Sequence, residues 1–239
     1  MEKETQKKSR TKKLIIFATA AVVALVLVFV VQGILRNNNL HQLALNNIAE
    51  ARFYMKQGET ANLRVNFSSG MREEPFIQNG IGERNVAFAL INVEPKNTSL
   101  STYTELNGRI RLGEEEIEVT IGRNEFRQQN FALDLERLVE RGTSVVLILT
   151  LTNDVLTIPL QDSMPEDAIT WERALEIAVE NSEEKIRGLG SFETYIKIIA
   201  DRGHNAVFWY VQFLNREAQT VFVVISPTGE VIGSTQAAA

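Results

Sequence analysis

The chain of 239 residues contains no cysteine and only two histidines. The absence of cysteine excludes a disulfide-bonded scaffold, a thiolate metal site and a cysteine nucleophile. His41 and His204 lie far apart in the sequence and give little support for a zinc site, which needs three or four converging ligands. A hydrophobic content of 44% with 23% charged residues is typical of globular proteins, so wholesale disorder is excluded.

Motifs for catalysis are also missing. The chain has no G-x-S-x-G, no G-x-x-x-x-G-K-[ST], no H-E-x-x-H and no EF-hand loop. An S-x-x-K match begins at Ser182, but it lacks the partner motifs of acyl-transferring enzymes. Acidic clusters at 114–118 and 162–167 are explained more simply as a solvated hairpin tip and a linker than as calcium ligands. We predict no catalytic residue, no metal ligand and no cofactor.

The longest uncharged stretch lies near the N-terminus. Residues 14–31 read LIIFATAAVVALVLVFVV, and no charge follows before residue 36. At 1.5 Å per residue, the uncharged stretch spans about 33 Å, enough for a hydrocarbon core of about 30 Å. Small-x-small triplets occur only near its start, which favours an anchor over a cleaved signal peptide. We therefore predict a transmembrane helix at 14–35, with the lipid bilayer as its partner.

Charge sets the predicted orientation of this segment. Residues 1–13 contain six basic residues, whereas Arg36 alone follows the uncharged stretch closely. The positive-inside rule then places the N-terminal tail in the cytoplasm and everything after residue 36 outside. The predicted localisation is the cell membrane, with a single pass and extracytoplasmic C-terminal domains. Because the chain beyond the tail is acidic, we predict no nucleic-acid partner.

Residues 36–58 are predicted to form a stalk. Apolar residues recur there at steps of three and four, which is the spacing of one helical face. Gly58 suits the C-terminal cap of such a helix. The apolar face could lie on the membrane, pair with a second copy, or pack on the next domain. The residues of this face are Leu40, Leu43, Ala44, Ile48, Ala51 and Met55.

Residues 59–163 show the alternation of β-strands. Several short strands with almost no helical pattern favour a β-sandwich. QGETANLRVNF at 57–67 and FALDLERLVERGTSVVLILTLT at 131–152 resemble strands of immunoglobulin-like domains of surface proteins. The resemblance implies adhesion, spacing or ligand presentation. The Cys-Trp-Cys signature of antibody domains is absent.

Two hairpins are predicted within this region. The first pairs Leu112 with Ile117 across the turn 113–116, and the second pairs Leu151 with Leu156 across Asn153-Asp154. Pro159 cannot donate a ladder hydrogen bond, so its strand is expected to be an edge or to end there.

Residues 164–236 change to a helix followed by strands. Thr170 is a plausible N-cap for a helix that runs to about Ile186. Strand-like runs follow at 192–200, 206–214 and 219–226, and a short last run follows the turn Pro227-Thr228-Gly229-Glu230. This order predicts a small α+β domain with the helix on an antiparallel meander.

Three pieces of the region 164–236 match one known family. They are ITWERALEIAVENS, VFWYVQFLNREAQTVFVVIS and PTGEVIGS. With these pieces the region resembles the PepSY domain, and the last piece resembles the family's turn and final strand. The resemblance implies a non-catalytic module that binds or restrains other proteins, often peptidases or cell-wall enzymes.

The central strand of this region has two apolar faces. Val207, Trp209, Val211 and Phe213 share the face that should meet the helix. The opposite face should be open, yet it is aromatic, and we predict it as a partner-binding face. The alternative is that the sandwich domain docks there. The predicted face consists of Phe208, Tyr210, Phe222 and Val224, the last two depending on register.

These segments together predict a function. The expected protein has a transmembrane helix, an immunoglobulin-like sandwich and a PepSY-like domain, and it is not an enzyme. It would be a membrane-anchored, extracytoplasmic regulatory protein that engages or restrains another envelope protein. One alternative is a structural component of an envelope assembly that forms a homo-oligomer through its stalk and membrane helix. The other alternative is a membrane-tethered hydrolase with an unrecognised site.

Overall fold

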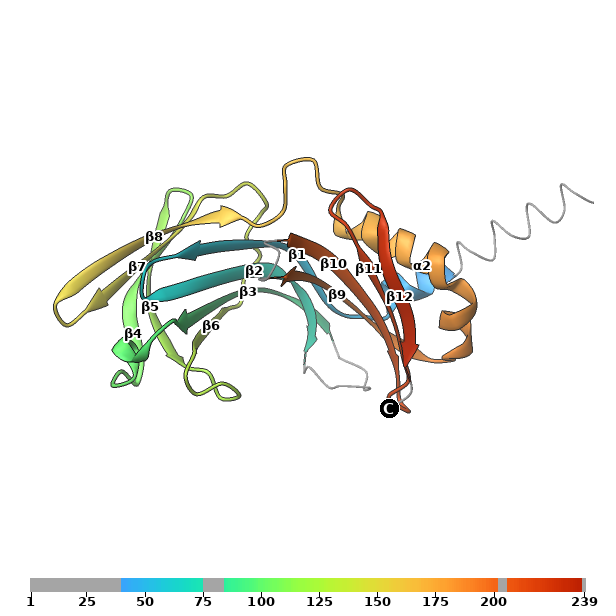
Figure 1. The fold of residues 1–239 in the computed structure, drawn as a ribbon, viewed down its shortest axis with the longest axis horizontal. Coiled ribbons are helices and arrows are strands. Elements are labelled where there is room, and N and C mark those ends of the chain that lie inside the picture. Colours follow the sequence, from blue (N-terminus) through green and yellow to red (C-terminus); the bar gives the residue numbers. More distant parts are fainter. Residues whose placement is uncertain (1–39, 75–83, 202–205, 238–239) are drawn as a thin grey trace, which may run out of the picture. The chain divides into compact units, whose positions relative to one another are not determined.

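The computed structural model describes residues 40–74, 84–201 and 206–237 (Figure 1). The chain divides into two units, 1–43 and 44–239. The described residues of the first unit begin a short helix that covers 40–46. All of the strands described below belong to the second unit.

The predicted membrane segment, 14–35, lies outside the described residues, as does the tail 1–13. Among the residues that are described, no helix is both long enough and apolar enough to cross a bilayer. The predicted fold class, a transmembrane helix with an immunoglobulin-like sandwich, is contradicted by this finding together with the closed sheet described below. The predicted single-pass localisation with extracytoplasmic domains is corrected on the same finding.

The prediction of a stalk helix over 36–58 is wrong for most of its length. The helix ends at residue 46, and the strand β1 (Ile48–Glu59) follows. The pairing of β1 shifts register between Ile48 and Glu50 and again between Arg52 and Tyr54. Each irregularity interrupts the two-residue alternation of a strand. The apolar residues are consequently spaced by three and four, which imitates a helical face.

The immunoglobulin-like β-sandwich predicted for 59–163 is also wrong. The strands of this region form one sheet in the order β1-β2-β3-β6-β5-β4-β7-β8, and β8 pairs back with β1 (Figure 1). A sheet closed on itself and a sandwich bury the same alternating residues, so the pattern does not distinguish them. The strands are β2 (Leu63–Glu74), β3 (Arg84–Pro95), β4 (Glu105–Leu112), β5 (Glu115–Arg123), β6 (Phe131–Leu135), β7 (Val145–Leu151) and β8 (Asp154–Asp162), with a 3-10 turn at Thr98–Leu100.

The closure between β1 and β8 is short and tightly packed. Lys56 lies opposite Asp162, and its buried Nζ, on a residue only 3% exposed, donates to Asp162 Oδ1 at 2.7 Å. A Cβ on Gly58 would lie 2.6 Å from Leu160, so glycine lets the two strands approach. The interior is filled by large apolar side chains, among them Phe67, Ile91, Ile121, Phe131 and Leu147.

Both predicted hairpins exist, but each has slipped by two residues. Ile110 rather than Leu112 lies opposite Ile117, and Leu149 rather than Leu151 lies opposite Leu156. In the first hairpin, Gly113 adopts a φ of 63°, which permits a two-residue turn that is tighter than predicted. A slip of two keeps each side chain on its face, so the core is unchanged.

Among the described residues, Pro159 lies in a stretch of β8 that has a paired strand on one side only. From Asp154 to Leu160 the described ladder joins β8 to β7, and β1 pairs only with residues 161 and 162. The edge position predicted for this proline therefore agrees with the pairing, although the strand continues to Asp162.

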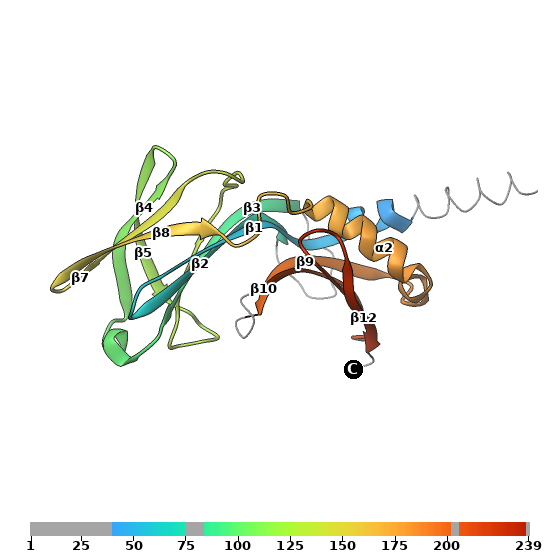
Figure 2. The same ribbon diagram turned by 45° about the horizontal axis from the view of Figure 1, so that its top comes forward.

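The helix and strands predicted after residue 164 are confirmed as elements. They are α2 (Trp171–Gly188), β9 (Phe192–Asp201), β10 (Ala206–Asn215), β11 (Thr220–Ile225) and β12 (Val231–Ala237). Thr170 is the N-cap of α2, and its Oγ1 accepts from the backbone N–H of Arg173. The four strands are antiparallel neighbours, and β9 joins β1 in parallel (Figure 2).

A substitution at Gly70 tests how closely the backbones of β1 and β2 approach at the bulge. A Cβ at this position would lie 1.9 Å from the carbonyl oxygen of Ala51. We expect Gly70→Ala to lower the free energy of unfolding by about 1–3 kcal/mol, because the two backbones must separate. Gly122→Ala is the matched control, since its Cβ would meet nothing within 4 Å, and it should change stability by about 1 kcal/mol or less. Urea unfolding measures both, and equal stabilities would contradict the close approach.

Candidate functional site

The helix α2 covers one face of the C-terminal strands. Trp209, Val211 and Phe213 of β10 are buried, as the alternation predicts. The buried residues of α2 are Ala174, Leu175, Ala178, Val179, Ser182 and Ile186, and those of β11 are Val221, Val223 and Ile225. Val207 differs from the other predicted members of this face, because it is only half-buried and lines a cavity at the strand end.

The opposite face brings together the four residues predicted as a partner-binding site. Phe208, Tyr210, Phe222 and Val224 are all half-buried, and we call them the aromatic face. Tyr210 lies directly opposite Val224, and its ring centroid is 5.5 Å from that of Phe222 at an interplanar angle of 31°. Burial raises the pKa of the Tyr210 phenol, which moves its ionisation still further above physiological pH. Phe222 and Val224, the two β11 residues whose position depended on register in the prediction, are two residues apart and both lie on this face.

The neighbouring strand β9 extends the aromatic face at its border. Ile199 lies opposite Phe208 and is 38% exposed, and Lys197 lies opposite Tyr210. Cross-strand partners point to the same side of a sheet, so both side chains belong to this face. The border is therefore apolar at one position and cationic at the next.

Beyond Lys197 the border continues into β1 as an ion-pair cluster. The buried carboxylate of Glu50 pairs with Arg52 Nε at 2.6 Å and with Lys197 Nζ at 3.4 Å. Burial alone would raise the pKa of Glu50, but the charges and hydrogen bonds of Arg52 and Lys197 outweigh it and lower the pKa. Glu50 is consequently ionised and holds both cations beside the aromatic face.

The other end of the same face is closed. Ala49, Tyr195 and Leu214 form a small buried cluster. The Tyr195 hydroxyl donates to Glu193 Oε2 at 2.6 Å, and burial raises the pKa of this tyrosine. The accessible half of this side of the sheet is therefore the half that contains the aromatic face and Ile199.

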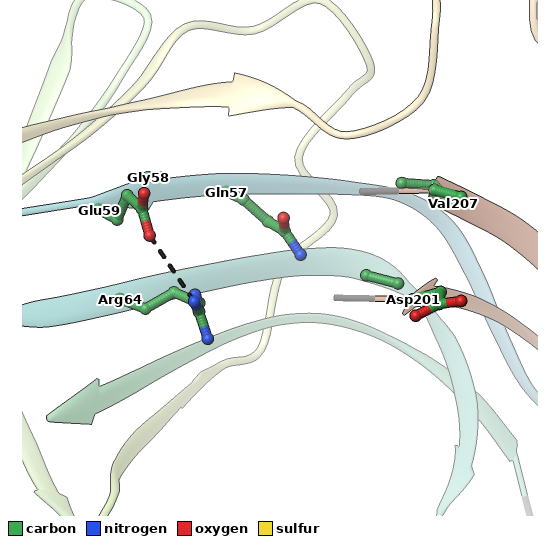
Figure 3. A pocket seen from close by; sticks show the side chains of 8 residues that line it. Gln57, Gly58, Glu59, Arg64, Asp201 and Val207 are labelled. Atoms are coloured by element: carbon green, nitrogen blue, oxygen red, sulfur yellow. Dashed lines mark ion pairs between the residues drawn. The ribbon is translucent and has the colours of Figure 1, made fainter. Parts of the chain in front are cut away.

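Two of the cavities outside the aromatic face adjoin the C-terminal elements. The first, about 310 Å³, lies between the ends of β1 and β2 and those of β9 and β10 (Figure 3). Its Arg64 is 3.7 Å from Glu59, and Glu59 also pairs with Lys96 at 2.9 Å. The second, about 300 Å³, is lined by Phe53 and Trp171, whose rings stack at 5.2 Å. Glu59 and Arg64 of the first cavity are engaged in ion pairs, and the ring stack of the second joins α2 to β1.

Ser182 and His204 are the other residues that the sequence offers for chemistry. Ser182 is buried in α2 and its hydroxyl has no hydrogen-bond partner, so no base activates it. His204 lies outside the described residues, and its pairing with Asp201 is not described. Within the described ranges, no group of three or more His, Asp or Glu side chains could hold a metal ion.

Three carboxylates of the acidic clusters noted in the sequence pair with basic side chains. At the β4–β5 hairpin, Glu116 contacts Arg109 at 2.6 Å and Arg111 at 3.0 Å, and Glu115 contacts Arg137 at 2.9 Å. In the second cluster, Asp162 accepts from Lys56. These carboxylates form ion pairs within the chain and do not converge on a common cation site.

Sequence reasoning missed the border of the aromatic face. The predicted stalk helix includes Glu50 and Arg52, and the sequence pattern assigns no face to Lys197 and Ile199. The signals available were the two-residue spacing of opposite charges in Glu50 and Arg52 and the alternation within β9. Neither signal shows that β1 and β9 are neighbours, because that pairing joins distant parts of the chain.

Comparisons of the chain with protein-family models, with curated proteins and with solved structures found no match.

Glu50 should make the stability of the protein pH-dependent. Its pKa in the folded state is lowered from 4.5, so its contribution is present at neutral pH and is lost as the pH falls through the lowered pKa. We expect Glu50→Gln to lower the free energy of unfolding by about 1–3 kcal/mol at neutral pH and by much less under acid conditions. Urea titrations at several pH values measure this difference, with the exposed Glu105→Gln as control. A loss independent of pH would show that the ion pairs do not stabilise the fold.

Proposed function

We propose that this chain is a non-catalytic binding protein that engages another protein through the aromatic face. The observation that carries the proposal is the gathering of Phe208, Tyr210, Phe222 and Val224 on the sheet face opposite α2. A sheet with a single helix layer usually alternates to polar residues on its other face. Here that face is apolar, as expected of a surface that another molecule covers.

The composition of the face suits protein recognition. Aromatic side chains bury about 150–250 Å² each and dominate the energy of many interfaces. The contact between Tyr210 and Phe222 restricts both rings before binding, which reduces the entropy lost on association. Lys197 and Arg52, held by Glu50, supply charge at the border. Border charges of this kind orient a partner more than they add affinity.

The resemblance of 164–236 to the PepSY domain suggests the class of partner. Domains of that kind bind or restrain peptidases and cell-wall enzymes, and we propose a partner from this class. The helix under Trp209 would then be the support of the binding surface, and the aromatic face its contact area. The part of the border on β1 would contribute charge from outside the PepSY-like region.

Photo-crosslinking tests the aromatic face directly. A photoreactive phenylalanine at position 210 should capture a defined protein in the source cells. The matched control carries the same group at Phe126, which is 94% exposed in a loop outside this face. Capture at both positions, or at neither, would contradict the proposal.

Alanine variants provide the quantitative test with the captured partner. We expect Tyr210→Ala and Phe222→Ala each to weaken binding by at least about tenfold, because each truncation costs more than about 1.4 kcal/mol at a hot spot. Both should lower the thermal stability less than a core truncation does, because the two side chains are only half-buried. Trp209→Ala is the core control and should lower stability by about 3–5 kcal/mol. Binding that survives both face variants while the protein stays folded would refute the aromatic face as the site.

A further inference from the structure

The strand β12 forms a free edge of the C-terminal sheet. It pairs with β11 on one side, and the described residues place no strand on the other side. Every residue from Ile232 to Ala237 is exposed. A free edge presents unpaired backbone N–H and C=O groups, which is a template for another strand.

This edge lacks the features that usually block strand addition. The sequence of β12, VIGSTQA, contains no charged residue and no proline. The edge stretch of β8 is different, since it contains Asp154 and Pro159. The one irregularity of β12 is a register shift near its start, and pairing is regular from Gly233 to Ala237. Of these two edges, β12 is therefore the one open to pairing.

The hairpin that leads into β12 shows which backbone groups are free. The N–H of Ser226 donates to the carbonyl of Glu230 at 2.7 Å, so these residues form a hydrogen-bonded pair. Hydrogen-bonded and non-hydrogen-bonded pairs alternate along an antiparallel ladder. Counting in twos along β11 makes Phe222 a hydrogen-bonded position, and it lies opposite Thr235. Thr235 consequently directs its N–H and C=O toward β11.

The neighbours of Thr235 direct their backbone groups the other way. Ser234 and Gln236 lie one residue to either side, so their N–H and C=O groups point to the free edge. With Ser234 and Gln236 on either side of Thr235, the free N–H and C=O groups form a self-complementary pattern. Two antiparallel copies of this strand can therefore pair with each other. Turned by a two-fold axis through Thr235, Ser234 of one copy faces Gln236 of the other.

We propose that two copies of this chain associate by antiparallel pairing of their β12 strands about a two-fold axis at Thr235. Each Ser234–Gln236 contact exchanges two backbone hydrogen bonds, which gives four across the axis. The absence of charge in β12 means that no like charges face each other in this arrangement. The two C-terminal sheets become continuous, and each keeps its own aromatic face.

The pairing is short, so the association is weak and depends on concentration. Thr235 faces its own symmetry mate as a non-hydrogen-bonded pair, in which the Cα atoms are about 4.5 Å apart. That separation lies within the range of about 4.4–6.8 Å that a disulfide spans. Because the native chain has no cysteine, a single introduced cysteine reports this contact alone.

The test compares Thr235→Cys with Thr157→Cys in the full-length chain under mild oxidation. Thr157 is an exposed threonine in the β8 edge stretch that contains Pro159, so it controls for random collision. We expect about tenfold more disulfide-linked dimer for Thr235→Cys than for the control. Non-reducing gel electrophoresis measures the dimer, and analytical ultracentrifugation measures self-association of the native chain.

A second variant separates this edge from any other contact between copies. Thr235→Lys places two positive charges opposite each other and should abolish the concentration-dependent association, whereas Thr157→Lys should leave it unchanged. The proposal is overturned if Thr235→Cys forms no more dimer than Thr157→Cys. It is also overturned if the native chain stays monomeric up to millimolar concentration, or if Thr235→Lys associates as the native chain does.

Discussion

The arrangement of the described chain depends on one edge of the strand β1, which pairs with β9 along one stretch and with β8 along another. One edge of β1 pairs with β2 along most of its length. The other edge pairs with β9 at Ile48–Ala51 and with β8 at Lys56 and Gln57. The register shift between Arg52 and Tyr54 lies between these two stretches, where the strand passes from one partner to the other. The closed sheet and the C-terminal sheet are thereby parts of one hydrogen-bonded system.

This division of one edge of β1 determines what surrounds the aromatic face. Because β9 is anchored on β1, Glu50 and Arg52 lie beside Lys197 although they come from the other end of the described chain. The sheet of the C-terminal region therefore includes the strand β1 and the charged side chains of Glu50 and Arg52, all of which precede residue 164 in the sequence. Its binding surface, as proposed, is a property of the assembled sheet and not of residues 164–236 alone.

Local patterns predicted the C-terminal elements well, since each depends on nearby residues. Thr170 caps its helix, and the alternation of Trp209, Val211 and Phe213 assigns both faces of β10 by parity. The aromatic face followed from the same parity. Patterns failed where structure depends on distant partners. A closed sheet and a sandwich bury the same alternating residues, and a hairpin slipped by two keeps them on the same side.

The error at β1 has a different cause. Bulges gave its apolar residues a helical spacing, and only its partners β2, β8 and β9 reveal it as a strand. The same spacing places Glu50 on the predicted stalk helix, so the sequence does not reveal that this residue borders the aromatic face. Recognition of its two-residue charge spacing with Arg52 would have suggested a strand, but it would not have identified β9 as the neighbour.

The contact between Lys56 and Asp162 joins residues 106 positions apart in the chain. On a ribosome that adds about 5–20 residues per second, β1 emerges roughly 5–20 s before the strand that closes the ring with it. During that interval the lysine has no carboxylate partner, and the edge that β8 and β9 will occupy is unprotected. Ring closure therefore cannot precede the emergence of β8, and until then the free edge of β1 can pair with other chains.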